Sequence, residues 1–413
     1  MSGTDSTDST AERHATWLEL FFDLVTIAGI GMLAHLLVEH HTGEGVAVYV
    51  VAFAAMWLIW ACFTIYANIA GEATRTMMML AGMGVLGVMT AAVPEITGEH
   101  GTEFAVVYVV GRLLAAQPWQ RATVVVDLPV VQASISVLPW VVSWWFEGTT
   151  QHVLWAVGVG LDLLLLLTTT RERLLADSQA RLDRVLRIRA RQRGGGRDRG
   201  RPPRQGRALP TSVDAANADV PHLGERLGLF VLVVLGEGLV QIVDGASEAV
   251  WDRELAVTGA GAFALMAGLW GVAVRWGYAG VALLPEGALS ARLSWAVHLP
   301  ATLGLATVAA VLGGMVAEPG EAVADYTRWV LVVAFGGYGL LSTVVQVGIA
   351  VAAETPAPRR TSLVRAARVA APAAAATLVV ALVPDLAAET LVWVLAAGVG
   401  GTLFAGHRRE VSS

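Results

Sequence analysis

Residues 17–38 read WLELFFDLVTIAGIGMLAHLLV, and this stretch decides the class of fold. A helix needs about 20 mostly apolar residues to cross the hydrocarbon core of a bilayer. The stretch meets that length, and Glu19 and Asp23 are its only acidic residues. It therefore predicts a membrane-spanning helix that carries two carboxyl groups.

Further apolar stretches of similar length follow along the chain, and together with the first they make twelve predicted spans. Pro118, Pro129 and Pro139 interrupt the fourth and the fifth of them. The twelve spans are 17–38, 46–66, 76–94, 104–119, 122–146, 151–170, 222–243, 255–279, 292–316, 328–352, 363–383 and 389–406. The predicted fold class is all-α: a polytopic integral membrane protein with about 12 transmembrane helices.

The composition excludes a soluble protein. Of the 413 residues, 55% are hydrophobic and 15% are charged, whereas about 25% are charged in a soluble domain. The single cysteine, Cys62, excludes a disulfide within the chain and a zinc or iron–sulfur site built from cysteines. Residues 1–16 are polar and lack the basic region of a cleaved signal peptide, so the first span is expected to stay in the mature protein.

The loop charges predict an orientation. With the N-terminus in the cytoplasm, 23 of the 28 basic residues, all of them Arg, fall on the cytoplasmic side and only Arg253 and Arg328 fall outside. The outside loops are rich in Asp and Glu instead. Cytoplasmic loops of membrane proteins carry an excess of basic residues. We therefore expect a multi-pass protein of the cell (inner or plasma) membrane with both termini in the cytoplasm.

An Arg-rich segment divides the spans into six plus six. It begins at Arg171, and we interpret it as a cytoplasmic linker that fixes the topology; a regulatory role is the alternative. An even number of spans per half gives both halves the same orientation, which is a parallel repeat. The predicted parts are a tail at 1–16, a first half at 17–170, the linker at 171–221, a second half at 222–406 and a tail at 407–413.

Charged residues inside the spans are the candidate functional groups. A charge at the centre of a spanning helix costs about 2.5–3.5 kcal/mol on insertion scales, so such residues should face protein or water. Because acids outnumber arginines here, some acids must carry protons or share a cation. The acids are Glu19, Asp23, Asp127, Asp162, Glu225 and Glu237, and the arginines are Arg112, Arg226 and Arg275.

Two short stretches concentrate these charges. Glu19 and Asp23 are four residues apart, so they stack on one helical face. His222, Glu225 and Arg226 share one helical turn, and Arg226 could pair with Glu19, Asp23 or Glu225. The stretches form either a proton or cation site, or an ion pair that clamps the two halves together.

Glu237 is the leading candidate for a functional carboxyl group. At a rise of 1.5 Å per residue it lies about 18 Å deeper than Glu225, between two glycines and far from any Arg in sequence. Arg112 is the expected deep counter-ion, for Asp162 or for Glu237. His35 is a candidate for proton relay, with a structural hydrogen bond as the alternative.

Metal and cofactor motifs are missing from the sequence. The helical His-Glu-x-x-His pattern is absent, and residues 39–41, Glu-His-His, form an adjacent run at an exposed helix end. No P-loop or dinucleotide fingerprint occurs either. We expect no metal, no cofactor and no nucleic-acid partner; the expected partners are the lipid bilayer and a small ion or solute.

Two stretches resemble a known family. They are residues 17–25, WLELFFDLV, which continue to Ala34-His35, and residues 222–230, HLGERLGLF, which are followed by VLGE at 234–237. Both are similar to motifs of the bacterial low temperature requirement protein A (LtrA) family, and their order and spacing fit nearly the whole chain. The resemblance implies a polytopic membrane protein linked by name to growth in the cold, without a settled reaction.

Three functions remain open at this point. The buried carboxyl groups favour a transporter or channel-like protein coupled to protons or cations. A membrane enzyme is the alternative: a neutral carboxyl group would be its general acid, and aromatic residues of the second span, Trp57, Trp60, Phe63 and Tyr66, would stabilise positive charge on an isoprenoid-like substrate. The third is a non-catalytic sensor or scaffold, in which the charges only hold helices together.

Overall fold

The computed structural model describes residues 14–120, 124–126, 135–169, 214–216, 218–352 and 356–407, with scattered residues between 172 and 188. The Arg-rich linker lies largely outside the described residues, as does Asp127. Apart from turns and loops, the described chain is helical except for two three-residue strands, β1 (Val124–Val126) and β2 (Asp214–Ala216), which pair in parallel. It divides into two units: unit 1 contains residues 1–41 and 219–413, and unit 2 contains residues 42–218.

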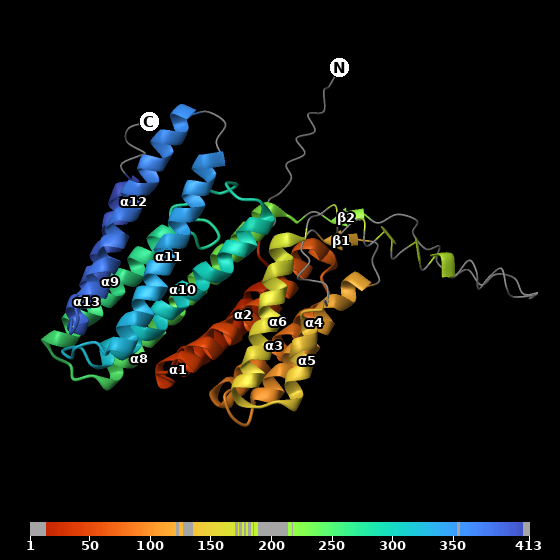
Figure 1. The fold of residues 1–413 in the computed structure, drawn as a ribbon, viewed down its shortest axis with the longest axis horizontal. Helices are drawn as coiled ribbons and strands as arrows, with labels where there is room; N and C mark the ends of the chain where they lie inside the picture. The colour runs from red at the N-terminus through yellow and green to blue at the C-terminus, as the bar shows by residue number, and fades with distance from the viewer. Residues whose placement is uncertain are drawn as a thin grey trace, which may run out of the picture. The chain divides into compact units, whose positions relative to one another are not determined.

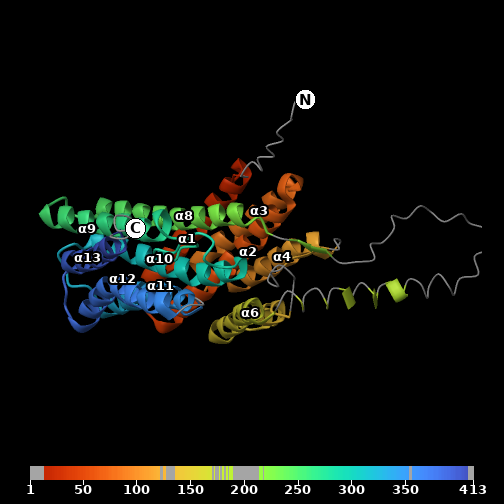
Figure 2. The same cartoon turned by 90° about the horizontal axis from the view of Figure 1, so that it is seen from above.

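Unit 1 is a ring of six helices with a seventh against it (Figures 1 and 2). Around the ring, α8 packs on α10, α10 on α11, α11 on α12, α12 on α13, α13 on α9 and α9 on α8, while α1 packs on α8 and α10. The helices are α1 (Trp17–Glu39), α8 (Val220–Glu248), α9 (Arg253–Trp270) with its π-helical continuation η5 (Gly271–Arg275), α10 (Ala291–Ala317), α11 (Asp325–Ala352), α12 (Pro356–Leu382) and α13 (Ala388–His407).

Unit 2 is built around α2. This helix packs on α3, α4 and α6, and Trp57, Trp60 and Phe63 of its aromatic run are fully buried. The run therefore fills the core of unit 2. The elements are α2 (Gly43–Ala70), η1 (Gly71–Ala73), α3 (Thr76–Ala92), η2 (Val93–Glu95), α4 (Gly101–Gln120), α5 (Val137–Val142), η4 (Ser143–Trp145) and α6 (Gly148–Thr168).

Polar caps set where several long helices begin. The first backbone N–H groups of a helix have no partner inside the helix, and a Ser, Thr, Asp or Asn side chain just before it accepts from them. Such caps start α1, α2, α8, α9 and α10, and the capping residues are Thr16, Thr42, Asp219, Asp252 and Ser290.

Among the residues that the structure describes, ten helices are long and apolar enough to cross a membrane: α1, α2, α3, α6 and α8–α13. Each coincides with a predicted span. The predicted span 104–119 coincides with α4, which is a single helix but is less apolar because it includes Glu103, Arg112 and Pro118. These helices confirm a polytopic α-helical membrane protein.

The predicted fifth span, one helix over 122–146, is wrong for the part of it that the structure describes. Val124–Val126 form β1, and the helix α5 covers only the six residues Val137–Val142. Pro139 lies inside α5 and has no N–H to extend a helical ladder. The count of twelve and the 6+6 repeat stay predictions; α1, which the repeat assigns to the first half, packs with α8 and α10.

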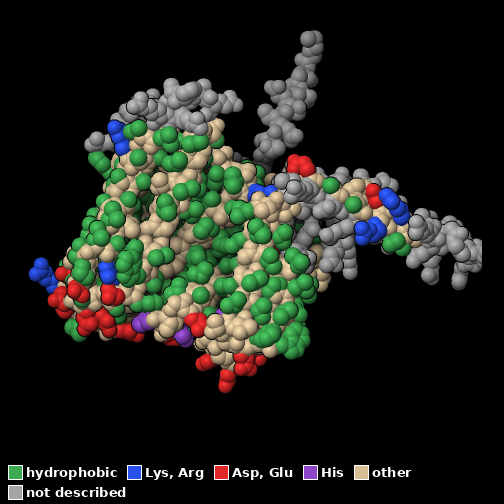
Figure 3. All heavy atoms as spheres, in the orientation of Figure 1, with side chains coloured by type: hydrophobic (Ala, Val, Ile, Leu, Met, Phe, Trp, Pro, Cys, Tyr) green, Lys and Arg blue, Asp and Glu red, His purple; other side chains and the backbone are tan. Residues whose placement is uncertain are grey.

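The surface of unit 1 separates by chemistry (Figure 3). Hydrophobic side chains cover its sides, and acidic side chains gather at one end. The exposed acids in the connections that follow α8, α10 and α12, or at the helix ends beside them, are Glu248, Asp252, Glu254, Glu318, Glu321, Asp325 and Asp385. All of them belong to predicted outside loops, although the orientation itself stays a prediction.

Candidate functional site

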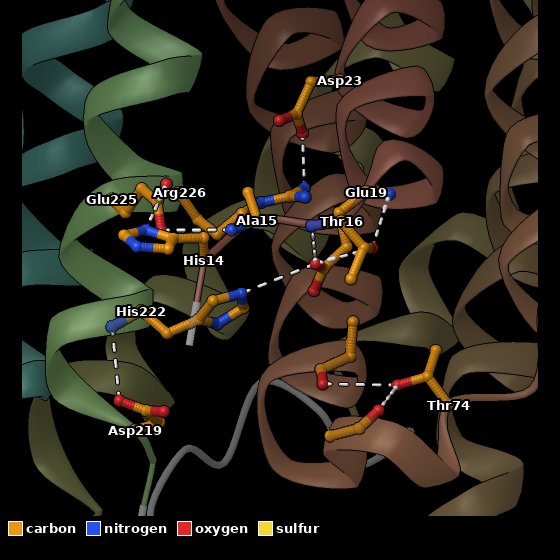
Figure 4. A network of polar contacts seen from close by, with 12 residues as sticks. His14, Ala15, Thr16, Glu19, Asp23, Thr74, Asp219, His222, Glu225 and Arg226 are labelled. Carbon is orange, nitrogen blue, oxygen red and sulfur yellow. Dashed lines mark hydrogen bonds and ion pairs between the residues drawn. The ribbon is translucent and has the colours of Figure 1, made fainter. Parts of the chain in front are cut away.

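Four charged or titratable side chains of unit 1 meet where α1 and α8 begin (Figure 4). Glu19 and Asp23 come from α1, and His222 and Arg226 come from α8; all four are buried. Arg226 Nη2 donates to Asp23 Oδ1 at 2.6 Å, and His222 Nε2 lies 3.5 Å from Glu19 Oε2. We call this group the charge cluster. The two stretches that resemble the LtrA motifs supply all of its members.

Glu19 also holds the start of α1. Its carboxylate accepts from the backbone N–H of Thr16 at 2.8 Å and from the Thr16 hydroxyl at 2.9 Å. In return, Thr16 Oγ1 accepts from the Glu19 N–H, which completes a capping box. Glu19 therefore has a structural role at the helix start in addition to its contact with His222.

This cap gives a stability prediction. We expect Thr16→Ala to lower the free energy of unfolding by about 1 kcal/mol, because an orphan N–H of α1 loses its acceptor. The measurement is denaturant-induced unfolding of the purified protein in detergent micelles. Thr16→Ser, which keeps the hydroxyl, should match the wild type; equal losses in both variants would contradict the cap.

The structure selects one partner for Arg226 among the three that the sequence left open. Asp23 is that hydrogen-bonded partner, whereas Glu225 accepts from the backbone N–H of Ala15 at 3.1 Å and lies 3.6 Å from His14 Nδ1. The cluster then contains two carboxyl groups against one guanidinium. Its formal charges balance when one proton sits on His222 or on a carboxyl group.

Glu237 lies deeper in α8, at a half-buried position. Gln241 Nε2 donates to its Oε1 at 2.8 Å. The carboxylate rests against Gly31 of α1, where a Cβ would stand only 2.7 Å from Glu237 Oε1. No ion pair to Glu237 occurs among the described residues. A glycine on the neighbouring helix thus makes room for a carboxyl group that has an amide partner and no counter-charge.

A polar stripe leads from Glu237 to the acidic end of unit 1. Gln241, Asp244 and Glu248 follow Glu237 at spacings of 4, 7 and 11 residues, which places all four on one face of α8. Gln241 is buried, whereas Asp244 and Glu248 are exposed. The stripe therefore connects the exposed acids with Glu237 along a single helix.

Unit 2 contains a separate buried ion pair, which resolves the predicted role of Arg112. Arg112 Nη1 and Nη2 donate to Asp162 Oδ2 and Oδ1 at 2.6 and 2.9 Å, and each residue is 1% exposed. The Ser136 hydroxyl donates to Asp162 Oδ1 at 2.7 Å, and Tyr108 accepts from Arg112 at 3.0 Å. Asp162 is therefore the counter-ion of Arg112. This paired and fully bonded geometry is typical of a structural ion pair.

His35 and His298 differ in environment. His35 is exposed on α1, away from the buried charge cluster. His298 is fully buried on α10, with Nε2 3.2 Å from the carbonyl oxygen of Leu227 and its ring against Phe230. This contact is the structural hydrogen bond that a buried histidine requires.

Sequence reasoning missed several residues that complete these sites. Thr16 forms a T-x-x-E capping signature with Glu19, a signal that was present in the sequence. Gln241 and Tyr108 each lie one helical turn from the charged residue that they contact, so the spacing also indicated them. Ser136 had no such signal, because its contact with Asp162 spans two helices. No three His, Cys, Asp or Glu side chains in the described part of the chain come close enough to hold a metal ion.

Long apolar helices around buried, mostly paired charges define a polytopic α-helical membrane protein. The chain belongs to the LtrA family: the model of the bacterial low temperature requirement A protein (LtrA) matches residues 14–400. This match confirms the resemblance of the two motifs. Comparison with curated proteins and with solved structures gives no match for the chain.

Proposed function

We propose that this protein transports protons or monovalent cations across the membrane, alone or coupled to a small solute, and that Glu237 is the carboxyl group on the path. The observation that carries the proposal is a half-buried carboxyl group, within a membrane-spanning helix, that has no ion pair among the described residues. The substrate class beyond a small ion or solute is left open.

Charge balance supports a bound proton or cation at Glu237. An ionised carboxylate inside a membrane is costly unless a counter-charge or water accompanies it. The Gln241 amide donates one hydrogen bond but brings no charge. A proton or a monovalent cation supplies that charge, and its binding and release are the elementary steps of coupled transport.

The polar stripe supports access from one side. Asp244 and Glu248 give this approach a negative potential, which raises the local concentration of cations. In the proposed orientation the stripe opens to the outside of the cell, and the charge cluster lies toward the cytoplasm.

A barrier separates the two sites. Leu227, Phe230, Val231 and Val234 are buried on α8 between Arg226 and Glu237. A transporter needs such a barrier because an open path would dissipate the gradient. We propose that the charge cluster, with Asp23 and His222, is a second proton-binding position on the cytoplasmic side of it.

The proposal predicts the outcome of one substitution. In proteoliposomes under an imposed gradient, we expect Glu237→Gln to reduce proton or monovalent-cation flux at least tenfold, because the amide keeps the shape but cannot bind the ion as a carboxylate does. A pH-sensitive dye inside the vesicles reports proton flux, and a sodium- or potassium-sensitive dye reports cation flux.

Glu254→Gln is the matched control, since it makes the same change at an exposed residue of α9, outside the polar stripe. We expect its flux to stay within about twofold of the wild type, because screening by salt weakens exposed charges. If the Glu237→Gln variant shows the same flux as the wild type, Glu237 is not on the transport path. If folded and inserted wild-type protein shows no flux, the transport proposal is overturned. The enzyme and the scaffold functions then remain.

A further inference from the structure

A cavity of about 410 Å³ lies within the helix ring of unit 1. Its walls come from α11, α12 and α13, with α9 and η5 closing one side. Glycine and alanine leave the space open: Gly339 faces it from α11, and Ala366 and Ala370 face it from α12. A Cβ at Gly339 would meet no atom within 4 Å.

The connection between η5 and α10 forms part of the lining. Ala282, in this non-helical segment, is buried, and its backbone is bonded to side chains of α11. Its N–H donates to Ser342 Oγ at 3.2 Å, and its carbonyl accepts from Gln346 Nε2 at 2.9 Å. Buried non-helical backbone requires such internal partners. Ser342 and Gln346 of α11 thus hold the segment in place.

Other hydroxyl groups of the lining are also bonded within the protein. Thr377 donates to the carbonyl of Ala373 at 2.8 Å, and Thr402 donates to the carbonyl of Gly398 at 3.1 Å. An ordered buried water needs two to four polar partners, whereas most of the lining is Leu, Val, Ala, Phe and Gly, and the Tyr338 hydroxyl is among its few polar groups. The cavity therefore favours an apolar occupant over water.

The mouth of the cavity lies on the apolar outer face of the ring. Leu340 of α11 and Leu378 of α12 line the cavity and are also 65% and 59% exposed. Val333 and Val344 extend the same exposed apolar face along α11, part of the hydrophobic side of unit 1. In a bilayer this face is in contact with acyl chains, so the cavity is continuous with the hydrocarbon core.

We propose that this cavity binds one acyl chain of a membrane phospholipid, inserted sideways between α11 and α12 and extending toward Ala282. An acyl chain has the apolar surface that the lining requires and is present at the mouth at high local concentration. This binding site rests on the ring of unit 1 and is independent of the proposed transport.

The test uses the full chain in nanodiscs that contain a phosphatidylcholine with a photoreactive diazirine near the end of one acyl chain. After irradiation, peptide mass spectrometry locates the adducts. We expect adducts on the lining of α11 and α12, and we expect Gly339→Leu, which fills the cavity, to reduce their yield at least fivefold. Gly337→Leu is the matched control, because Gly337 is exposed and equally free of neighbours within 4 Å.

Equal yields in the wild type and in Gly339→Leu would overturn the proposal, as would adducts spread evenly over the exposed faces of all helices. A second arm replaces the lipid probe with a diazirine fatty acid. Labelling of the lining by the free acid alone would overturn the phospholipid assignment. The thermal unfolding temperature of Gly339→Leu is the folding control. If it equals or exceeds that of the wild type, the variant is folded and its lost labelling reports a filled cavity.

Discussion

Replacing Asp162 with Asn should lower the free energy of unfolding by about 3–5 kcal/mol, because it leaves the Arg112 guanidinium buried without its counter-charge. Both side chains are almost completely buried and share two hydrogen bonds. Asn keeps an acceptor for one of these bonds but removes the negative charge. The measurement is denaturant-induced unfolding in micelles, with the folded fraction after purification as a second readout.

Two further variants separate charge burial from simple loss of a contact. Arg112→Met combined with Asp162→Leu removes both charges and should recover most of the stability, since an apolar pair of similar volume can replace a buried ion pair. Asp325→Asn makes the same chemical change in a pair whose carboxylate is 81% exposed. Its partner Arg328 is buried but also donates to the carbonyl oxygens of Val380 and Ala381, so this substitution should cost clearly less than Asp162→Asn. Equal losses in Asp162→Asn and Asp325→Asn would contradict the structural role of the buried pair.

Gly245→Ala should be the most damaging small substitution in unit 1, at about 3 kcal/mol, the upper end of the range for overpacking. The backbones of α8 and α10 touch at this position: a Cβ on Gly245 would collide with the carbonyl oxygen of Gly313. On the facing helix, a Cβ on Gly313 would stand 2.8 Å from the carbonyl oxygen of Gln241. Backbone atoms cannot rotate away as a side chain can, so the helices must separate.

Gly236→Ala is the control for that prediction, because the same substitution on the same helix meets no atom within 4 Å. Alanine has the higher helix propensity by about 1 kcal/mol, so this variant should be neutral or slightly stabilising. Thermal unfolding of the two variants in one detergent compares them directly. A Gly245→Ala variant as stable as Gly236→Ala would show that the α8–α10 contact is looser than the structure has it.

Most of the fold could be predicted because membrane spans are local features. Length and hydropathy placed α1, α8 and α10 within a few residues of their observed bounds. The predicted fifth span failed where prolines interrupt an apolar run, because hydropathy does not register the missing N–H of Pro139. Hydropathy left residues 280–291, around Ala282, outside the predicted spans, but it did not predict that Ala282 is buried.

Half of the candidate site could be predicted as well. An ionisable residue in an apolar run is conspicuous, so Glu237, Asp23 and Arg226 stood out in the sequence. Their environments did not: nothing near Glu237 in the chain indicates Gly31, and nothing in the stretch around Arg226 favours Asp23 over Glu225. The sequence alone therefore could not distinguish a paired carboxyl group from an unpaired one, because the distinction depends on how the helices pack.

By itself the sequence determined the class of protein, the family and most of the helices, because apolar length and end caps depend on residues that are neighbours in the chain. Only the tertiary structure decided which charges meet. Arg226 and Asp23 are 203 positions apart, and Arg112 and Asp162 are 50 apart. Each residue added to a helix turns the side-chain direction by about 100°, so the packing angle and the register between helices select the partner, and no local pattern encodes them.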